Sequence, residues 1–278
     1  MKTAVLSGKG GAGKTMVAVN LSAVTGHSVY VDCDVEEPNG RLFFHPEGIE
    51  TEEVFTLLPE FDMEKCTGCR ACTDFCRFNA IVYIRGKMKL FDEVCHSCGG
   101  CKLVCPEKAV SERKNPIGVI ETGVHGDTKV VTGILNLGEA SGVPVISQAL
   151  KKGYSLGENV IVDCPPGSAC SVMESVTDAD YCILVAEPTA FGFHNFRMVY
   201  ELVSLLKKPC GVVINKMNEP YEPLETFCRE EQIPVLLRIP YDRKFAELGS
   251  AGKILVEKES DIRAMFTELS EKIGGVLS

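Results

Sequence analysis

Two runs of four cysteines carry much of the chemical information in this sequence. Eight of its fourteen cysteines fall in one block, and each run is spaced Cys-x₂-Cys-x₂-Cys-x₃-Cys. The second run repeats the first with an offset of 29 residues. Because no export signal precedes them, thiols this close together are expected to bind soft metals and not to form disulfides. The eight positions are Cys66, Cys69, Cys72, Cys76, Cys95, Cys98, Cys101 and Cys105.

A glycine-rich loop near the N-terminus is the second informative feature. The apolar run Lys2–Leu6 leads into this loop, and helical spacing follows over Val17–Val24. Such a loop aims backbone N–H groups at phosphate oxygens, and the helix N-terminus adds positive potential. The pattern predicts a P-loop, in which Lys14 reaches the β- and γ-phosphates and the Thr15 hydroxyl binds Mg²⁺. The predicted nucleotide-binding positions in the loop are Gly8, Gly10, Gly11, Ala12, Gly13, Lys14, Thr15 and Met16.

Carboxylates follow two further apolar runs. Asp32-Cys33-Asp34 comes directly after Val29–Val31, and Asp163 comes directly after Val160–Val162. The carboxyl ends of parallel strands meet at one edge of a sheet, where ligands bind in open α/β folds. We therefore interpret these carboxylates as part of the nucleotide site and not as solvated surface charges.

The segment Lys9–Thr15 resembles the deviant P-loop of the MinD/Mrp family of ATPases, which includes the nitrogenase iron protein. Asp32–Asp34 and Asp163–Gly167 look like the family's acidic motifs, and Asn215-Lys216 looks like its adenine-contacting segment. The resemblance covers nearly the whole NTPase portion. It implies an ATP-sandwich homodimer in which Lys9 reaches across to the partner's phosphates.

The same resemblance implies individual roles. Lys9, Lys14 and Asp34 would be catalytic, with Asp34 positioning the attacking water. Asp32 and Asp163 would join Thr15 in holding Mg²⁺, directly or through water, and Asn215 would line the adenine pocket.

The cysteine block resembles a bacterial ferredoxin with two [4Fe–4S] clusters. In that pattern three closely spaced thiolates bind one cluster and the fourth reaches the other. The resemblance implies a first cluster on Cys66, Cys69, Cys72 and Cys105, and a second on Cys95, Cys98, Cys101 and Cys76. Two Cys₄ zinc sites are the alternative, although structural zinc usually takes its ligands as separated pairs.

Short apolar runs alternate with helical spacing along the rest of the chain. This alternation predicts an α/β fold with a doubly wound, mostly parallel sheet, formed by residues 1–61 and 112–278. Residues 62–111 interrupt it and are expected to form an inserted α+β ferredoxin-like domain. The further predicted strands are Gly118–Glu121, Val143–Ile146, Val160–Val162, Tyr181–Ala186, Gly211–Ile214 and Val235–Ile239. The further predicted helices are Asn195–Leu206, Pro223–Glu231 and Asp261–Ile273.

Composition narrows the class of protein. The formal net charge of -9 argues against nucleic-acid binding, which normally needs a basic face. The sequence has no long apolar run, and Ser260–Ser278 is not basic, so we expect a cytoplasmic protein without stable membrane anchoring. The six scattered cysteines receive no functional assignment: Cys33, Cys164, Cys170, Cys182, Cys210 and Cys228.

Two functions fit these features. The first is an ATPase that couples dimer changes to electron transfer through two clusters, toward an unidentified redox partner. The segment 34–61 would act as a switch-like connection between the nucleotide site and the insert. The second is an ATP-dependent carrier that delivers iron–sulfur or metal cofactors to a receiving protein. Carriers of the Mrp type use a Cys-Pro-x-Cys pair, which this sequence lacks.

Overall fold

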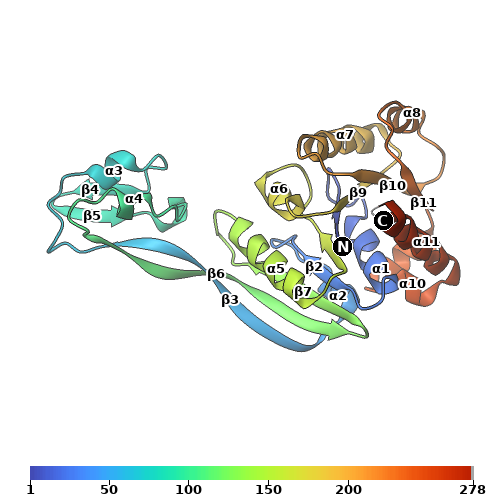
Figure 1. Ribbon diagram of the computed structural model, residues 1–278, viewed down its shortest axis with the longest axis horizontal. Helices are drawn as coiled ribbons and strands as arrows, with labels where there is room; N and C mark the ends of the chain where they lie inside the picture. Colours follow the sequence, from blue (N-terminus) through green and yellow to red (C-terminus); the bar gives the residue numbers. More distant parts are fainter. Residues whose placement is uncertain (277–278) are drawn as a thin grey trace.

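A nine-stranded sheet forms the centre of the main body (Figure 1). The computed structural model describes residues 1–276. The strand order is β11-β10-β9-β1-β8-β2-β7-β6-β3, in which β11 through β7 are parallel to one another and β6 and β3 are antiparallel additions. The strands are β1 (Lys2–Leu6), β2 (Val29–Asp32), β3 (Glu47–Phe61), β6 (Val110–His125), β7 (Thr128–Leu135), β8 (Val160–Asp163), β9 (Tyr181–Ala186), β10 (Cys210–Met217) and β11 (Val235–Pro240).

Helices cover both faces of this sheet, so its central strands are buried on two sides. Along β1, Ala4 and Leu6 pack into one hydrophobic core while Val5 packs into the other. This explains why the strand sequences are continuously apolar instead of alternating. The first core is covered by α5 (Val143–Leu156), α6 (Cys170–Val176), α7 (Ala190–Leu205) and α8 (Glu222–Glu230), and the second by α1 (Lys14–Val24), α10 (Leu255–Lys258) and α11 (Ser260–Val276).

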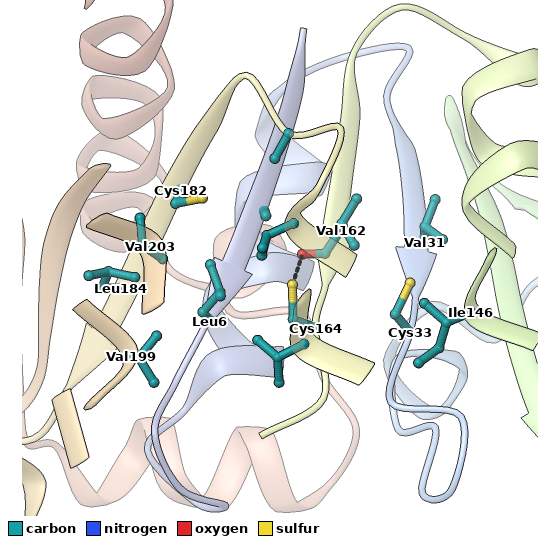
Figure 2. Packing of buried hydrophobic residues seen from close by; sticks show 14 of the residues in the cluster. Leu6, Val31, Cys33, Ile146, Val162, Cys164, Cys182, Leu184, Val199 and Val203 are labelled. Atoms are coloured by element: carbon teal, nitrogen blue, oxygen red, sulfur yellow. Dashed lines mark hydrogen bonds between the residues drawn. The ribbon is translucent and has the colours of Figure 1, made fainter. Parts of the chain in front are cut away.

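Four of the scattered cysteines, Cys33, Cys164, Cys182 and Cys228, belong to the first core. Figure 2 shows Cys33, Cys164 and Cys182 among leucine, valine and isoleucine side chains, and all three are fully buried. The thiol of Cys164 lies 3.9 Å from the carbonyl oxygen of Val162. Burial raises the pKa of each of these thiols, so they act as small apolar side chains in this core.

A long two-stranded ribbon leaves the main body and carries a distal lobe (Figure 1). Strands β3 and β6 pair along their length, from Glu47 opposite Val124 to Phe61 opposite Val110. We call residues 62–109, which lie beyond this last pair, the distal lobe. It contains α3 (Ala71–Phe75), β4 (Ile81–Ile84), β5 (Lys87–Leu90), the short helix η1 (Asp92–Val94) and α4 (Gly100–Leu103). The body also contains α2 (Arg41–Phe44) and α9 (Arg243–Ser250).

The doubly wound, mostly parallel fold is confirmed, but two predicted strands need correction. Val143–Ile146 is not a strand: it forms the first turn of α5, where Pro144 suits a helix start and apolar spacing continues along one face. Gly118–Glu121 is a strand, but it lies within the antiparallel β6. The segment 34–61, expected as a connection, contains the 15-residue strand β3. Much of β3 is acidic and exposed, which hid its strand pattern.

The C-terminal helix α11 packs against the main body. Its apolar side, with Ile262, Phe266, Leu269 and Ile273, is buried in the second core. Residues 277–278 of the predicted acidic tail lie outside the described residues. No helix within residues 1–276 has the length and apolar character needed to cross a membrane.

The phenol of Tyr181 gives a stability test of this core. Tyr181 is 1% exposed, and its hydroxyl has no hydrogen-bond partner among the described residues. Tyr181→Phe should therefore raise the free energy of unfolding by about 1 kcal/mol, because a desolvated hydroxyl is removed without breaking a bond. Urea denaturation measures this. Tyr200→Phe, which removes a hydrogen bond of 3.2 Å to Glu231, is the control and should not be stabilising. A clear decrease in the free energy of unfolding of Tyr181→Phe would contradict the absence of a hydrogen bond to this hydroxyl within residues 1–276.

Candidate nucleotide site and cysteine lobe

The glycine loop joins β1 to α1 and is shaped by its glycines. Gly11 and Gly13 have φ angles of +79° and +97°, which side-chain-bearing residues rarely adopt. Gly8 is needed for space, because a Cβ there would lie 2.1 Å from the backbone oxygen of Asn195 in α7. A Cβ on Gly13 would lie 2.1 Å from the Asn215 amide nitrogen. The loop is therefore held against β10 and α7, with its N–H groups available at the start of α1.

Lys14 is buried below this loop among carboxylates. Its Nζ donates a hydrogen bond of 2.6 Å to Oδ1 of Asp163 and lies 3.6 Å from Oδ2 of Asp34. Burial alone would lower the pKa of Lys14, but the charges of Asp163, Asp34 and Asp32 outweigh it and raise the pKa. The ammonium is thus a fixed positive charge at the base of the cavity.

Asp32 and Asp163 lie side by side at the ends of β2 and β8. They are register partners in the sheet, and both side chains are fully buried. The N–H groups of Gly40 and Asp34 donate to Asp32, at 2.8 and 3.1 Å. Burial and the charge of Asp163 nevertheless raise the pKa of Asp32 to about 7, against the effect of Lys14. Burial also raises the pKa of Asp34. Such a pair has a strong electrostatic preference for a further cation.

Lys9 lies on the outer side of the loop in an ion-paired group. Glu187, at the end of β9, forms ion pairs with Lys9 and with Lys216, the latter at 2.6 Å. Lys216 also donates a hydrogen bond of 2.7 Å to the carbonyl of Gly11. Burial disfavours the charge of Glu187, but hydrogen bonds from the two lysines outweigh burial and lower its pKa. Glu187 therefore holds both lysines against the loop.

A cavity of about 650 Å³ opens above the loop. Its opposite walls come from the segment after β2, from the start of α5 and from residues 249–252. The predicted residues that line it are Lys9, Gly10, Gly11, Gly13, Lys14, Thr15, Met16 and Asp34. Asp32 and Asp163 are buried below the cavity. Gly8 and Ala12 belong to the loop but do not line the cavity.

Asn215 lies under the loop and not among the residues that line this cavity. Its side-chain amide donates a hydrogen bond of 2.8 Å to the carbonyl of Ala12, and the side chain is almost completely buried. In this structure Asn215 thus supports the phosphate loop. The adenine contact stays a prediction.

Sequence reasoning missed two residues of this site. Glu187 directly follows the apolar strand β9, a position of the same kind as Asp32 and Asp163, so its signal was present. Tyr30 had no such signal. The Tyr30 hydroxyl donates a hydrogen bond of 2.9 Å to Oδ2 of Asp163. In the sequence, however, a tyrosine within an apolar strand is indistinguishable from an ordinary core residue.

In the distal lobe, the two predicted ligand sets line two separate cavities. Cys76, Cys95, Cys98 and Cys101 line a cavity of about 210 Å³. Cys66, Cys69, Cys72 and Cys105 line a second, smaller cavity of about 20 Å³. Each cavity is thus lined by three cysteines of one run and the fourth cysteine of the other run. That these sets bind clusters stays a prediction.

The offset of 29 residues is repeated in the backbone of the lobe. Gly68 and Ser97 both have positive φ, as do Arg70 and Gly99. Helix α3 begins at Ala71, and α4 begins 29 residues later at Gly100. These left-handed residues shape two similar cysteine loops. The N–H of Ser97 lies 3.4 Å from the Cys95 sulfur, a contact that stabilises a thiolate.

Within residues 1–276, no group of three His, Cys, Asp or Glu side chains is arranged to hold a metal ion. The two [4Fe–4S] clusters therefore stay a prediction. Each would need room for an inorganic core between four thiolates. The larger cavity has room for such a core. The smaller one holds little more than a water molecule, so its loop would have to move outward.

Comparisons with known proteins agree with this fold. The family model described as "CobQ/CobB/MinD/ParA nucleotide binding domain" matches residues 3–256. An uncharacterized protein of Methanocaldococcus jannaschii is 30% identical, with 98% of this chain and 96% of that protein covered. An iron–sulfur cluster carrier protein of Pyrococcus horikoshii is 25% identical, over 98% and 85%. The cell division ATPase MinD of Pyrococcus furiosus has a TM-score of 0.60 at 17% identity, over 99% and 98%.

The ion pairs of Glu187 give a testable pH effect. In nucleotide-free protein, Glu187→Gln should lower the free energy of unfolding at pH 7 by about 1–2 kcal/mol. Because the pKa of Glu187 is lowered in the folded state, this stabilisation is present above its ordinary value of 4.5 and is lost as the pH falls further. Denaturation of both proteins across this range measures the difference.

The control for this experiment is Glu201→Gln. Glu201 is 3.9 Å from Arg197 on an exposed helix face, so its loss should change stability by less than about 0.5 kcal/mol. If Glu187→Gln behaved like the control, or if its effect grew toward acid, the site would not hold the lysines as described.

Proposed function

The chain belongs to the CobQ/CobB/MinD/ParA nucleotide-binding family, and on that premise we propose that it couples ATP binding and hydrolysis to electron transfer through two [4Fe–4S] clusters. The active form would be an ATP-bound homodimer. The observation that carries this proposal is the ribbon, in which continuous pairing of β3 with β6 joins the main body to the eight-cysteine lobe.

The ribbon is anchored at both ends by ion pairs. On the body side, Glu52 of β3 pairs with Lys152 of α5, and Glu121 of β6 lies 3.4 Å from Arg41 of α2. On the lobe side, β6 pairs through Glu112 with Lys102 and through Arg113 with Asp92. A 15-residue strand spans roughly 45–50 Å, so the paired strands can transmit a tilt at their base as a displacement of the lobe.

The nucleotide site has the groups that phosphoryl transfer needs. Lys14 and the N–H groups of the loop would hold the phosphates, and Thr15, Asp32 and Asp163 would hold Mg²⁺, directly or through water. Asp34 lies in the cavity wall beside Lys14, where it would orient a water molecule. Bound Mg²⁺ would neutralise charge on the phosphates and on the two buried carboxylates.

Dimerisation would complete the site through Lys9. In this structure Lys9 is held by Glu187, and its side chain is 25% exposed. In an ATP-bound dimer it would turn toward the facing subunit. Transfer of Lys9 to the partner's phosphates would leave Glu187 paired with Lys216, so no buried carboxylate would lose its last counter-charge. Hydrolysis would then depend on the dimer.

The lobe would hold one cluster on each crossed set of four cysteines. When bound, [4Fe–4S] clusters accept and release single electrons. The protein would contribute thiolate ligands, N–H groups near sulfur and a partly apolar surrounding that includes Phe75, Phe78 and Ile81 around the larger cavity. The receiving redox protein would be a separate partner.

Cofactor delivery is the second candidate function. The resemblance to an iron–sulfur cluster carrier protein over nearly the whole chain favours it. A labile-cluster site near the nucleotide would have to use Cys33, Cys164 or Cys170, but Cys33 and Cys164 are fully buried in the core. Anaerobic transfer of ⁵⁵Fe from the loaded protein to an apo-ferredoxin, stimulated by ATP, would favour the carrier function over electron transfer.

Lys9→Ala tests the dimer-dependent ATPase. Because an extra cation at the transferring phosphate accelerates hydrolysis by large factors, the rate should fall at least about 100-fold. Binding of MgADP to the monomer should stay close to wild type. Phosphate release and isothermal titration calorimetry measure the two. Lys151→Ala, an exposed lysine on α5, is the matched control; equal rates in both variants would contradict the role of Lys9.

Cys101→Ser tests the ligand sets. Anaerobically purified wild type should contain about eight iron and eight sulfide per chain, and the variant about four of each, because only the second cluster loses a ligand. The matched control is Cys170→Ser, an exposed cysteine outside the lobe, which should keep the full content. Zinc in place of iron, or an unchanged iron content in Cys101→Ser, would overturn the assignment.

A further inference from the structure

Tyr30 is a buried residue that neither the sequence motifs nor the proposed chemistry account for. It lies in β2, is completely buried, and donates a hydrogen bond of 2.9 Å to Oδ2 of Asp163. Its hydroxyl oxygen also lies 3.5 Å from Oδ2 of Asp32. The other oxygen of Asp163 accepts from Lys14. The phenol therefore fixes the orientation of a carboxylate whose two oxygens have different partners.

The ring of Tyr30 makes a second set of contacts, which connects the carboxylates to the ends of β3 and β6 in the main body. It packs on Phe44 of α2 with ring centroids 5.0 Å apart, and Phe44 meets His125 edge-on at 5.6 Å. His125 is the last residue of β6, and β3 begins three residues after Phe44. Both strands of the ribbon are thus rooted beside this aromatic group, which consists of Tyr30, Phe44 and His125.

The backbone at Gly40 passes close to the hydroxyl group of Tyr30. A Cβ on Gly40 would lie 2.3 Å from the hydroxyl oxygen of Tyr30, and the N–H of Gly40 donates to the same Asp32 oxygen that lies near the phenol. The φ angle of Gly40 is -57°, so backbone conformation does not require glycine there. The lack of a side chain at this position is instead explained by the space that the phenol occupies.

We propose that Tyr30 is a positioning residue that links the magnesium-site carboxylates to the root of the ribbon, so that binding of a magnesium nucleotide changes the packing at Phe44 and His125. The inference rests on the proposed nucleotide binding. A phenylalanine would fill the same core volume without the hydroxyl. The linkage therefore depends on the hydrogen bond, because a carboxylate that turns toward Mg²⁺ must move or release the phenol that it holds.

Tyr30→Phe separates this role from simple packing. We expect the Mg²⁺ concentration for half-maximal ADP binding to rise about 10-fold, as for other residues that orient metal ligands, while ADP binding in EDTA stays unchanged. In wild type, MgADP should slow amide hydrogen exchange at residues 41–50 and 118–125, and this slowing should be largely lost in the variant. Tyr181→Phe, which removes a buried hydroxyl with no hydrogen-bond partner within residues 1–276, is the matched control and should respond like wild type.

Gly40→Ala provides a second variant, which disturbs the phenol while keeping its hydroxyl, and it should also reduce the response at the ribbon root. If MgADP binds to wild type but leaves exchange at the root unchanged, or if Tyr30→Phe keeps both the Mg²⁺ dependence and the protection, Tyr30 is only a packing residue. If wild type does not bind MgADP at all, the proposed function itself fails, and this inference fails with it.

Discussion

The burial of two neighbouring carboxylates constrains the main body more than any other interaction. Asp32 and Asp163 are register partners at the ends of adjacent parallel strands and are shielded from water. Two buried negative charges this close are stable only with a cation or with a proton on one of them. Lys14 supplies that cation here, which places the start of α1, and with it the glycine loop, directly above the strand ends. The geometry of the phosphate site thus follows from the need to compensate this pair.

The same constraint gives the nucleotide site a means of acting at a distance. A bound Mg²⁺ would take over part of the compensation that Lys14 provides, and every group that contacts the carboxylates would respond. These groups include the phenol of Tyr30 in β2 and the N–H of Gly40, which lies on the segment between β2 and β3. At its base the ribbon is held in the main sheet, where Gly118–His125 of β6 pair with β7, and beyond it β3 and β6 stay paired up to the lobe. A tilt of the ribbon as a whole would therefore displace the lobe.

Local patterns in the sequence were sufficient for the parts of the site that depend on short-range chemistry. The glycine loop with Lys14, the acidic ends of β2 and β8 and the doubly wound sheet are all marked by neighbouring residues. The crossed cysteine sets are implied by the ferredoxin resemblance and stay a prediction as cluster ligands. Val143–Ile146 was mispredicted because a short apolar run fits a buried strand as well as a helix turn, and only tertiary packing separates the two.

The features that escaped prediction depend on residues distant in sequence. Strand β3 is acidic and exposed over much of its length, and it is a strand because it pairs with β6, which begins only at Val110. The hydrogen bond from Tyr30 to Asp163 joins positions 133 residues apart, and no local pattern marks it. Glu187 is an intermediate case: its place after β9 was visible, but its two lysine partners come from the glycine loop and from β10.

The central claim is that the nucleotide site and the two clusters influence each other. The most direct measurement is the EPR spectrum of the anaerobically purified, dithionite-reduced protein, recorded with and without MgATP. With about eight irons per chain and ATP bound, the account predicts a reproducible change in the cluster signals on adding MgATP, and no such change with Mg²⁺ alone. Identical spectra in a protein that contains its clusters and binds MgATP would contradict it.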